Sequence, residues 1–194
     1  MAVLMMLEVP GGTVEQYERV NEILGVDGDS AAEGLLYHVA AASEDGLVIA
    51  DVWRSEEDLE RFFEDADSAI KEAGMPDATP RIAPVHNHIP SRDAEPGVLA
   101  IIELENFTPD DYDKMTAQMD SHGSLDDHPS VAHIAAVTED GGFLVVDVWE
   151  SPEAFAAFAE SQIAPAGEQV GLGPVEPRFA TVHNTITGAD APTR

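Results

Sequence analysis

The sequence contains no cysteine, so it can form neither a disulfide framework nor a thiolate metal site or nucleophile. Basic residues are also scarce, because 9 Lys and Arg stand against 38 Asp and Glu, for a formal net charge of −29. Binding to a phosphate backbone needs clustered Lys and Arg, which argues against nucleic acid and anionic membranes as partners. We expect a solvated acidic surface of the halophilic kind, adapted to high cytoplasmic salt, where screening relieves repulsion between like charges.

Long apolar runs and signature loops are missing as well. No run approaches the ~18 apolar residues of a membrane span, and the N-terminal segment lacks the basic region that opens a signal peptide. The sequence has no Gly-rich phosphate loop, nucleophile elbow or dinucleotide fingerprint. These absences predict a cytoplasmic protein that binds no membrane and no nucleic acid.

An internal repeat is the main feature that the sequence does have. His38-Val-Ala-Ala-Ala-Ser-Glu-Asp-Gly46 recurs as His133-Ile-Ala-Ala-Val-Thr-Glu-Asp-Gly141, and an Asp-Val-Trp triplet follows each copy. The spacing between equivalent positions grows from 95 residues at the histidines to 97 at Pro80 and Pro177, as small loop insertions would produce. The repeat predicts two domains, residues 1–92 and 96–188, with a disordered tail at 189–194.

Each copy shows the same order of predicted elements. In the first copy, strands are expected at residues 3–9, 35–41, 47–53 and 81–89. Thr13 and Gln16 form a capping box for a helix that Gly25 ends, and Ser55 begins a second helix. In the second copy, Thr108 and Ser151 begin the equivalent helices. The order β-α-β-β-α-β is the ferredoxin-like pattern, so the predicted class is α+β.

The repeated unit resembles the dimeric α/β barrel superfamily, in particular its antibiotic-biosynthesis-monooxygenase-like (ABM-like) branch. The resemblance rests on the element order and on two matching segments, Asp51-Val-Trp53-x-Ser55-x-x-x-Leu59-x-x-Phe62 and Asp147-Val-Trp149-x-Ser151-x-x-x-Phe155-x-x-Phe158. Members of this superfamily usually close their barrel as homodimers. For a tandem repeat, the resemblance implies two ferredoxin-like units that form an intramolecular dimeric α/β barrel, with further homo-oligomers left open.

Strand alternation sorts the polar residues of the strands by face. If the more aliphatic set of each strand faces the helices, a repeated polar set points to the opposite face, toward the barrel interior. A buried charge or imidazole is costly unless it is paired, so this set is either a hydrogen-bonded structural network or the lining of a ligand cavity in each half. The set consists of Glu8, His38, Asp51, Trp53 and His86, with the copies Glu103, His133, Asp147, Trp149 and His183.

In the ligand-cavity interpretation, these residues divide by chemistry. An imidazole titrates near pH 6.5 and suits a general base that an aspartate orients. The indole of Trp53 or Trp149 would stack on a ligand ring, with Glu8 and Glu103 beside it. The candidate catalytic residues are therefore His38, Asp51, His86, His133, Asp147 and His183.

The other histidines are considered as metal ligands or as surface residues. His86 and His88 share one side of a strand and, with a carboxylate, can hold a metal ion. The second copy has Thr185 in place of the second histidine and no metal-binding motif supports the pair, so no metal is predicted. His122 and His128 occur only in a loop of the second copy and are expected on the surface.

Three functions remain open. The resemblance implies a small-molecule ligand and a cofactor-independent oxygenase, in which a base removes a proton from an aromatic or polyketide-like substrate and the carbanion reacts with oxygen. A non-catalytic stress-associated or ligand-binding barrel is the second hypothesis. A haem protein is the third, because haem-degrading and chlorite-dismutase-like enzymes share the barrel, but the helices lack the expected haem-binding histidine. No cofactor is therefore expected, and the sequence leaves open whether the protein is an enzyme.

Overall fold

The structure is a computed structural model of the 194-residue chain that describes residues 1–26, 31–120 and 128–192. The chain forms two compact units. The first contains Met1–Val85 and the segment from Ala180 onward, and the second contains His86–Phe179. Strands β4 (Arg81–Ile89) and β8 (Arg178–Thr187) therefore each begin in one unit and end in the other.

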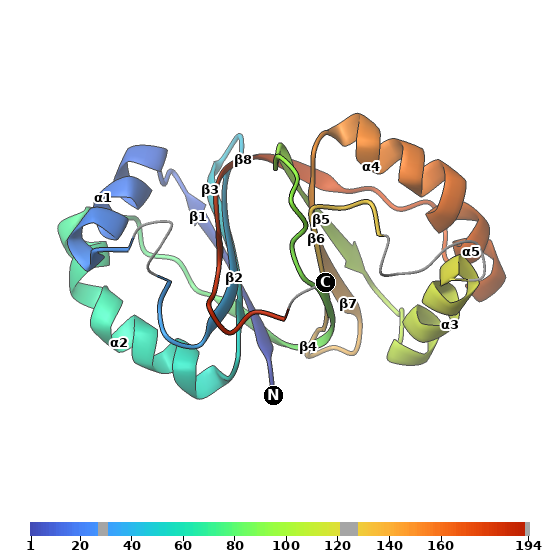
Figure 1. The fold of residues 1–194 in the computed structure, drawn as a ribbon, viewed down its shortest axis with the longest axis horizontal. Helices are drawn as coiled ribbons and strands as arrows, with labels where there is room; N and C mark the ends of the chain where they lie inside the picture. Colours follow the sequence, from blue (N-terminus) through green and yellow to red (C-terminus); the bar gives the residue numbers. More distant parts are fainter. Residues whose placement is uncertain (27–30, 121–127, 193–194) are drawn as a thin grey trace. The chain divides into compact units, whose positions relative to one another are not determined.

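The first unit is built from β1 (Val3–Pro10), α1 (Val14–Leu24), β2 (Leu35–Ala42), β3 (Gly46–Trp53) and α2 (Glu56–Glu72). Strand β3 pairs antiparallel with both β1 and β2. The start of β4 extends this sheet beside β1, and the end of β8 extends it beside β2. Helices α1 and α2 cover the same face of these strands (Figure 1).

The predicted helix ends of this unit are confirmed. The Thr13 hydroxyl accepts a hydrogen bond from the Gln16 backbone N–H, and the Gln16 side chain bonds back to the Thr13 backbone. Gly25 ends α1 with a φ of 67°, a left-handed conformation that favours glycine. Ser55 caps α2 by accepting from the Asp58 backbone N–H.

The second unit is built from β5 (Val98–Leu104), α3 (Pro109–Asp120), β6 (Ala132–Val137), β7 (Phe143–Trp149), α4 (Pro152–Phe158), the π-helix η2 (Ala159–Ile163) and α5 (Ala164–Val170). The sequence predicts one helix after Ser151, but the structure inserts a π-turn. The Ala164 N–H bonds to the Ala159 carbonyl five residues back, and Pro165 lacks an N–H to continue an α-helical ladder.

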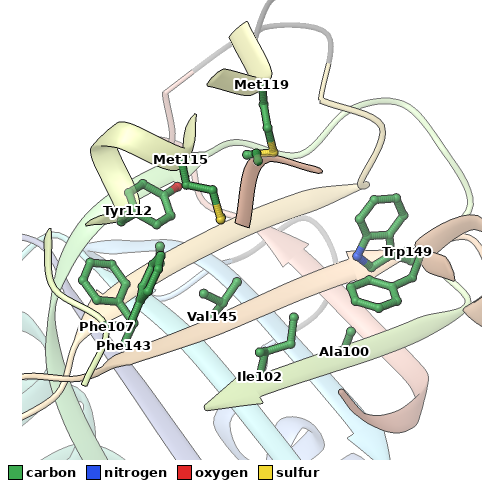
Figure 2. Packing of buried hydrophobic residues seen from close by; sticks show 12 residues of the cluster. Ala100, Ile102, Phe107, Tyr112, Met115, Met119, Phe143, Val145 and Trp149 are labelled. Atoms are coloured by element: carbon green, nitrogen blue, oxygen red, sulfur yellow. The ribbon is translucent and has the colours of Figure 1, made fainter. Parts of the chain in front are cut away.

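The hydrogen-bonded strand order is β1-β3-β2-β8-β5-β7-β6-β4, a closed barrel. The predicted α+β class and the tandem barrel are therefore confirmed. In the second unit, aromatic and sulfur-containing side chains from α3 pack onto the sheet, with Met115 and Met119 projecting from the helix above Val145 (Figure 2). Among the described residues, no helix is both long and apolar enough to cross a membrane.

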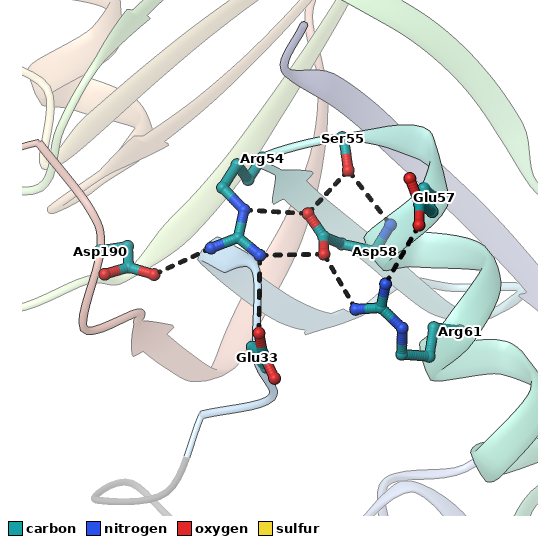
Figure 3. A network of polar contacts seen from close by, with 7 residues as sticks. All are labelled: Glu33, Arg54, Ser55, Glu57, Asp58, Arg61 and Asp190. Atoms are coloured by element: carbon teal, nitrogen blue, oxygen red, sulfur yellow. Dashed lines mark hydrogen bonds and ion pairs between the residues drawn. The ribbon is translucent and has the colours of Figure 1, made fainter.

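A charged cluster fixes the start of α2 in the first unit (Figure 3). The buried Asp58 carboxylate accepts two hydrogen bonds of 3.0 Å from Arg54 and one of 3.1 Å from Arg61. These hydrogen bonds, led by those of Arg54, lower the pKa of Asp58 to about 2. Arg54 also lies 3.2 Å from Asp190, so the tail predicted to be disordered makes an ion pair in its described part. Residues 193–194 of that tail lie outside the described residues.

Candidate functional site

A chain of three buried side chains crosses from helix to sheet in the first unit. The Tyr17 hydroxyl on α1 lies 2.7 Å from Nε2 of His38 on β2, and Nδ1 of His38 lies 2.7 Å from Oδ1 of Asp51 on β3. An ionised aspartate can only accept, so the His38 Nδ1–H donates to Asp51 and Nε2 accepts from the tyrosine O–H. Tyr17, His38 and Asp51 thus form one polar relay, hereafter the first relay.

Two asparagine side chains hydrogen-bond to the Tyr17 phenol oxygen of the first relay. Nδ2 of Asn184 on β8 donates to the Tyr17 oxygen over 2.9 Å, and Asn21, one turn further along α1, also hydrogen-bonds to it. Burial raises the pKa of Tyr17, and the hydrogen bonds from Asn184 and Asn21 oppose that rise because they stabilise the phenolate.

The second unit contains an equivalent second relay. The Tyr112 hydroxyl on α3 lies 2.8 Å from Nε2 of His133, and Nδ1 of His133 lies 2.7 Å from Oδ1 of Asp147. Asn87 on β4 donates to the Tyr112 oxygen over 2.8 Å. The position of Asn21 holds Thr116, whose hydroxyl bonds to backbone carbonyls of α3 instead. Burial raises the pKa of Tyr112 strongly, and Asn87 opposes it.

The predicted side of the sheet was wrong for the core of both relays. The sequence placed His38, Asp51, Trp53 and their copies on the face away from the helices, whereas the contacts with Tyr17 and Tyr112 place the histidines and aspartates under α1 and α3. Hydrophobicity could not decide the side because every residue of β7 is buried, so both of its faces are covered. The side of β7 that carries Asp147 faces the helices, where Asp147 hydrogen-bonds to His133 and His133 to Tyr112 of α3.

The histidines of β4 and β8 each lie beside the relay of the other sequence copy. His86 was expected beside His38, but its Nε2 lies 2.7 Å from Asp113 of α3, and its ring packs edge-on against Tyr112 of the second relay. His183 was expected beside His133, but it lies 3.3 Å from Glu18 of α1 and packs edge-on against Tyr17. The physical reason is that β4 and β8 end in the opposite unit from the one in which they begin.

A local irregularity in β8 explains how neighbouring residues reach the same side. The pairing of β2 with β8 shifts between Ala40, opposite Asn184, and Ala41, opposite Val182. Such a bulge interrupts the strict alternation of side chains. It lets both His183 and Asn184 face α1, which alternation counted from the sequence could not show.

The four predicted substrate-binding residues lie outside the relays. Trp53 and Trp149 are 1 % exposed and pack against Phe62 and Phe158 in the cores between helices and sheet. Glu8 and Glu103 are exposed and alternate away from the helix-covered face, and Glu103 lies 3.5 Å from Arg178. Their predicted contact with a ligand remains a prediction.

The remaining histidines gather in the second unit. His128, expected on the surface, is 6 % exposed, and its ring lies 5.1 Å from that of His133 and 4.8 Å from that of Phe158. Burial, followed by the charge of His133, lowers the pKa of His88 to about 4. His122 lies outside the described residues. Among those that are described, no cluster of three metal-binding side chains joins His86 and His88.

The two relays differ in the space beside them. A cavity of about 370 Å³ adjoins the first relay and is walled by both helices, by β1 and β3 and by the segment after α2. Tyr17, Asn21, His38 and Asp51 form its polar floor, and Phe62 and Phe63 of α2 lie in its wall. The equivalent space beside the second relay is about 40 Å³. A water molecule occupies about 30 Å³ in the liquid, so only the first relay adjoins room for a ligand among the described residues.

Comparisons with known proteins give the fold and no closer relation. No family model and no curated protein matches the sequence. A provisionally assigned monooxygenase from Lactobacillus acidophilus NCFM is 13 % identical over 96 % of each chain, with a TM-score of 0.70. An anthrone oxidase-like protein is 17 % identical over 100 % of this chain and 96 % of its own, with a TM-score of 0.53. A heme-degrading enzyme from Listeria monocytogenes is 9 % identical over 93 % and 99 %, with a TM-score of 0.52. The chain has the ABM-like ferredoxin fold, which confirms the resemblance drawn from the sequence.

The sequence-based prediction found the histidine and aspartate of each relay but missed the tyrosine and the asparagines. Tyr17 and Tyr112 stand at the repeat spacing of 95 residues, but no role was predicted for their hydroxyl groups. The usable signal was that a tyrosine hydroxyl repeated on a buried helix face needs a polar partner. Asn87 and Asn184 also recur, at a spacing of 97 residues, but the sequence did not identify what they bind.

Proposed function

We propose that the first unit binds a small, largely apolar molecule in the cavity beside the first relay and exchanges a proton with it. The observation that carries this proposal is the position of Tyr17, His38 and Asp51 on the floor of a cavity of about 370 Å³. That volume lies within the range of roughly 300–1,000 Å³ typical of small-molecule sites, which combine apolar walls with a few convergent polar groups.

The hydrogen bonds of the first relay suggest how the proton moves. The lone pair of His38 Nε2 is already taken by the Tyr17 O–H, so a ligand meets the tyrosine oxygen first. The ligand's proton passes to that oxygen while the tyrosine's own proton passes to Nε2. The resulting imidazolium lies against Asp51, which stabilises its charge. Asn184 holds the phenol oxygen in place during the transfer, and the ligand's hydroxyl takes the place of Asn21 as the second donor to that oxygen.

The composition of the cavity wall supports a neutral aromatic or polyketide-like ligand. Apolar side chains dominate the wall, Phe62 and Phe63 offer ring faces, and none of the described Lys or Arg residues lines it. Asp67 and Asp77 are exposed at its rim and disfavour an anion. With a phenol or enol as substrate and dioxygen as oxidant, the deprotonated ring would take one oxygen atom and release the other as water. This is the monooxygenase-like reaction that the resemblance implies, and one structural neighbour is an anthrone oxidase-like protein.

A ligand-binding protein without catalysis is the second candidate. It is supported by the second relay, which keeps the same hydrogen bonds beside a space of about 40 Å³, as a network with a structural role alone would. The four histidines beside the two tyrosines do not fit haem ligation. Both ring nitrogens of His38 and of His133 are engaged, and Nε2 of His86 and of His183 faces a carboxylate.

The test uses 2-naphthol, a neutral fluorescent phenol, followed by anthrone in oxygenated buffer. Calorimetry is expected to show binding that Phe63→Trp abolishes by filling the cavity, whereas Phe155→Trp in the second unit has no effect on it. Oxygen uptake with anthrone that Tyr17→Phe removes supports the oxygenase. Binding without oxygen uptake supports the non-catalytic alternative, and absence of binding to the wild-type protein contradicts both.

A further inference from the structure

The internal repeat provides a natural comparison between an open and a closed version of one site. Tyrosine, histidine, aspartate and asparagine occupy equivalent places in both units, and the hydrogen bonds between them agree within 0.1 Å. The cavities beside them differ about ninefold, 370 Å³ against 40 Å³. The difference therefore arises outside the relays, in the side chains and the π-turn η2 that surround the second one.

Larger side chains occupy the second unit at three places. Val20 on α1 corresponds to Met115 on α3, at the same spacing of 95 residues as the two tyrosines. Ala78 corresponds to Val175, at the spacing of 97 residues found at Pro80 and Pro177. The exposed Asp67 corresponds to the half-buried Ile163. All six residues line their respective spaces, so the substitutions fill the volume directly.

His128 fills the second space further. It is buried in contact with the rings of His133 and Phe158, whereas the position 95 residues earlier holds the exposed Glu33. Figure 2 shows Met115 and Met119 reaching from α3 toward the sheet beside Tyr112. Apolar and aromatic side chains thus occupy the volume that the first unit leaves open for a ligand.

We propose that the second unit holds a closed copy of the ligand site, in which Met115, Val175 and His128 occupy the ligand's place and the second relay serves only to satisfy buried polar groups. The chain accordingly binds one ligand, in the first unit. This inference rests on the proposed function for the identity of the ligand, but the count of cavities that adjoin a relay does not depend on it.

The test exchanges the residues that distinguish the two units. The opening variant, Met115→Val with Val175→Ala and His128→Ala, gives the second unit the smaller residues. The closing variant, Val20→Met with Ala78→Val, gives the first unit the larger ones. Crystals pressurised with xenon count apolar cavities without reference to any substrate. Beside the relays, we expect one xenon site in the wild-type protein, two in the opening variant and none in the closing variant. The groove of about 420 Å³ along η2 and α5 contains no relay residue, so xenon bound there is not counted.

Calorimetry with 2-naphthol then counts ligands in the same three proteins. We expect one molecule per chain for the wild type, two for the opening variant and none for the closing variant. Two molecules bound to the wild type, or an unchanged xenon count in a folded opening variant, would overturn the inference. If the opening variant fails to fold, the closing variant still decides, because retention of wild-type binding by a folded closing variant also overturns it. Xenon sites as expected without 2-naphthol binding would contradict the proposed function alone.

Discussion

Nδ2 of Asn184 donates a hydrogen bond of 2.9 Å to the hydroxyl of Tyr17, although 167 residues separate the two in the chain. Asn87 makes the equivalent bond of 2.8 Å to Tyr112. The last strand of each sequence copy therefore completes the relay formed by the other copy. A separated single repeat would lack the amide that holds its own tyrosine.

Tyrosine ionisation is expected to separate Tyr17 from the other two tyrosines. Burial raises the pKa of Tyr37 and Tyr112 strongly, whereas at Tyr17 the hydrogen bonds from Asn184 and Asn21 oppose the rise. In an absorbance titration at alkaline pH, the first phenolate to appear should be that of Tyr17. Asn184→Leu should move this step to higher pH, with Asn87→Leu as the matched control that leaves it in place. Persistence of the first step in Tyr17→Phe would refute the assignment.

Removing either relay histidine is expected to destabilise the fold. His38→Ala leaves the Tyr17 hydroxyl and the Asp51 carboxylate buried without their partner, and His133→Ala does the same to Tyr112 and Asp147. An unsatisfied buried polar group costs about 1–3 kcal/mol, so urea unfolding should show a loss of that order in both variants. Only His38→Ala should also weaken binding of 2-naphthol. Equal losses of binding in the two variants would contradict a site confined to the first unit.

Acid unfolding should depend on Asp58. Its pKa falls from the ordinary 3.8 to about 2 in the folded chain, so the unfolded state binds its proton first as the pH drops. The stabilisation from this carboxylate is therefore complete above about pH 4 and is lost as the pH falls toward 2. Urea unfolding between pH 5 and 2 should show a weaker pH dependence for Asp58→Asn than for the wild type. Glu57→Gln, at an exposed neighbour, should retain the wild-type slope.

His88 is expected to affect stability in a higher pH range than Asp58. Burial lowers its pKa from 6.5 to about 4, so the unfolded chain takes up this proton below about pH 6.5 while the folded chain stays neutral there. Stability should then decrease as the pH falls from 6.5 to 4, by at most about 1.4 kcal/mol per pH unit for one proton. His88→Thr introduces the residue found at the equivalent Thr185 and should remove this slope. A slope unchanged from the wild type would show that another group causes it.

Salt should stabilise the protein. The net charge of −29 opposes compaction through repulsion, and added salt screens exposed charges over shorter distances. The melting temperature is therefore expected to rise with KCl concentration across the molar range, as measured by circular dichroism. A melting temperature that is flat or falls with KCl would contradict the predicted adaptation to high salt.

The sequence was sufficient for the order and the ends of most elements because those depend on local chemistry. The capping box at Thr13, the helix end at Gly25 and the cap at Ser55 involve residues a few positions apart, and each forms as predicted. The sequence did not predict the π-turn at Ala159. Pro165 lacks the backbone N–H of an α-helical hydrogen bond, and this loss leaves the spacing of the apolar residues unchanged.

The sequence by itself determined that the protein is a tandem repeat of ferredoxin-like units, with His38 and Asp51, and likewise His133 and Asp147, on the same side of adjacent strands. The structure pairs the two residues of each set directly. Only the tertiary structure decided which face of the sheet those pairs occupy, because both faces are buried and hydrophobicity does not distinguish them. The exchange of His86 and His183 between the relays follows from strands that pair far from their own repeat. The open and closed cavities follow from the packing of side chains that no local pattern brings together.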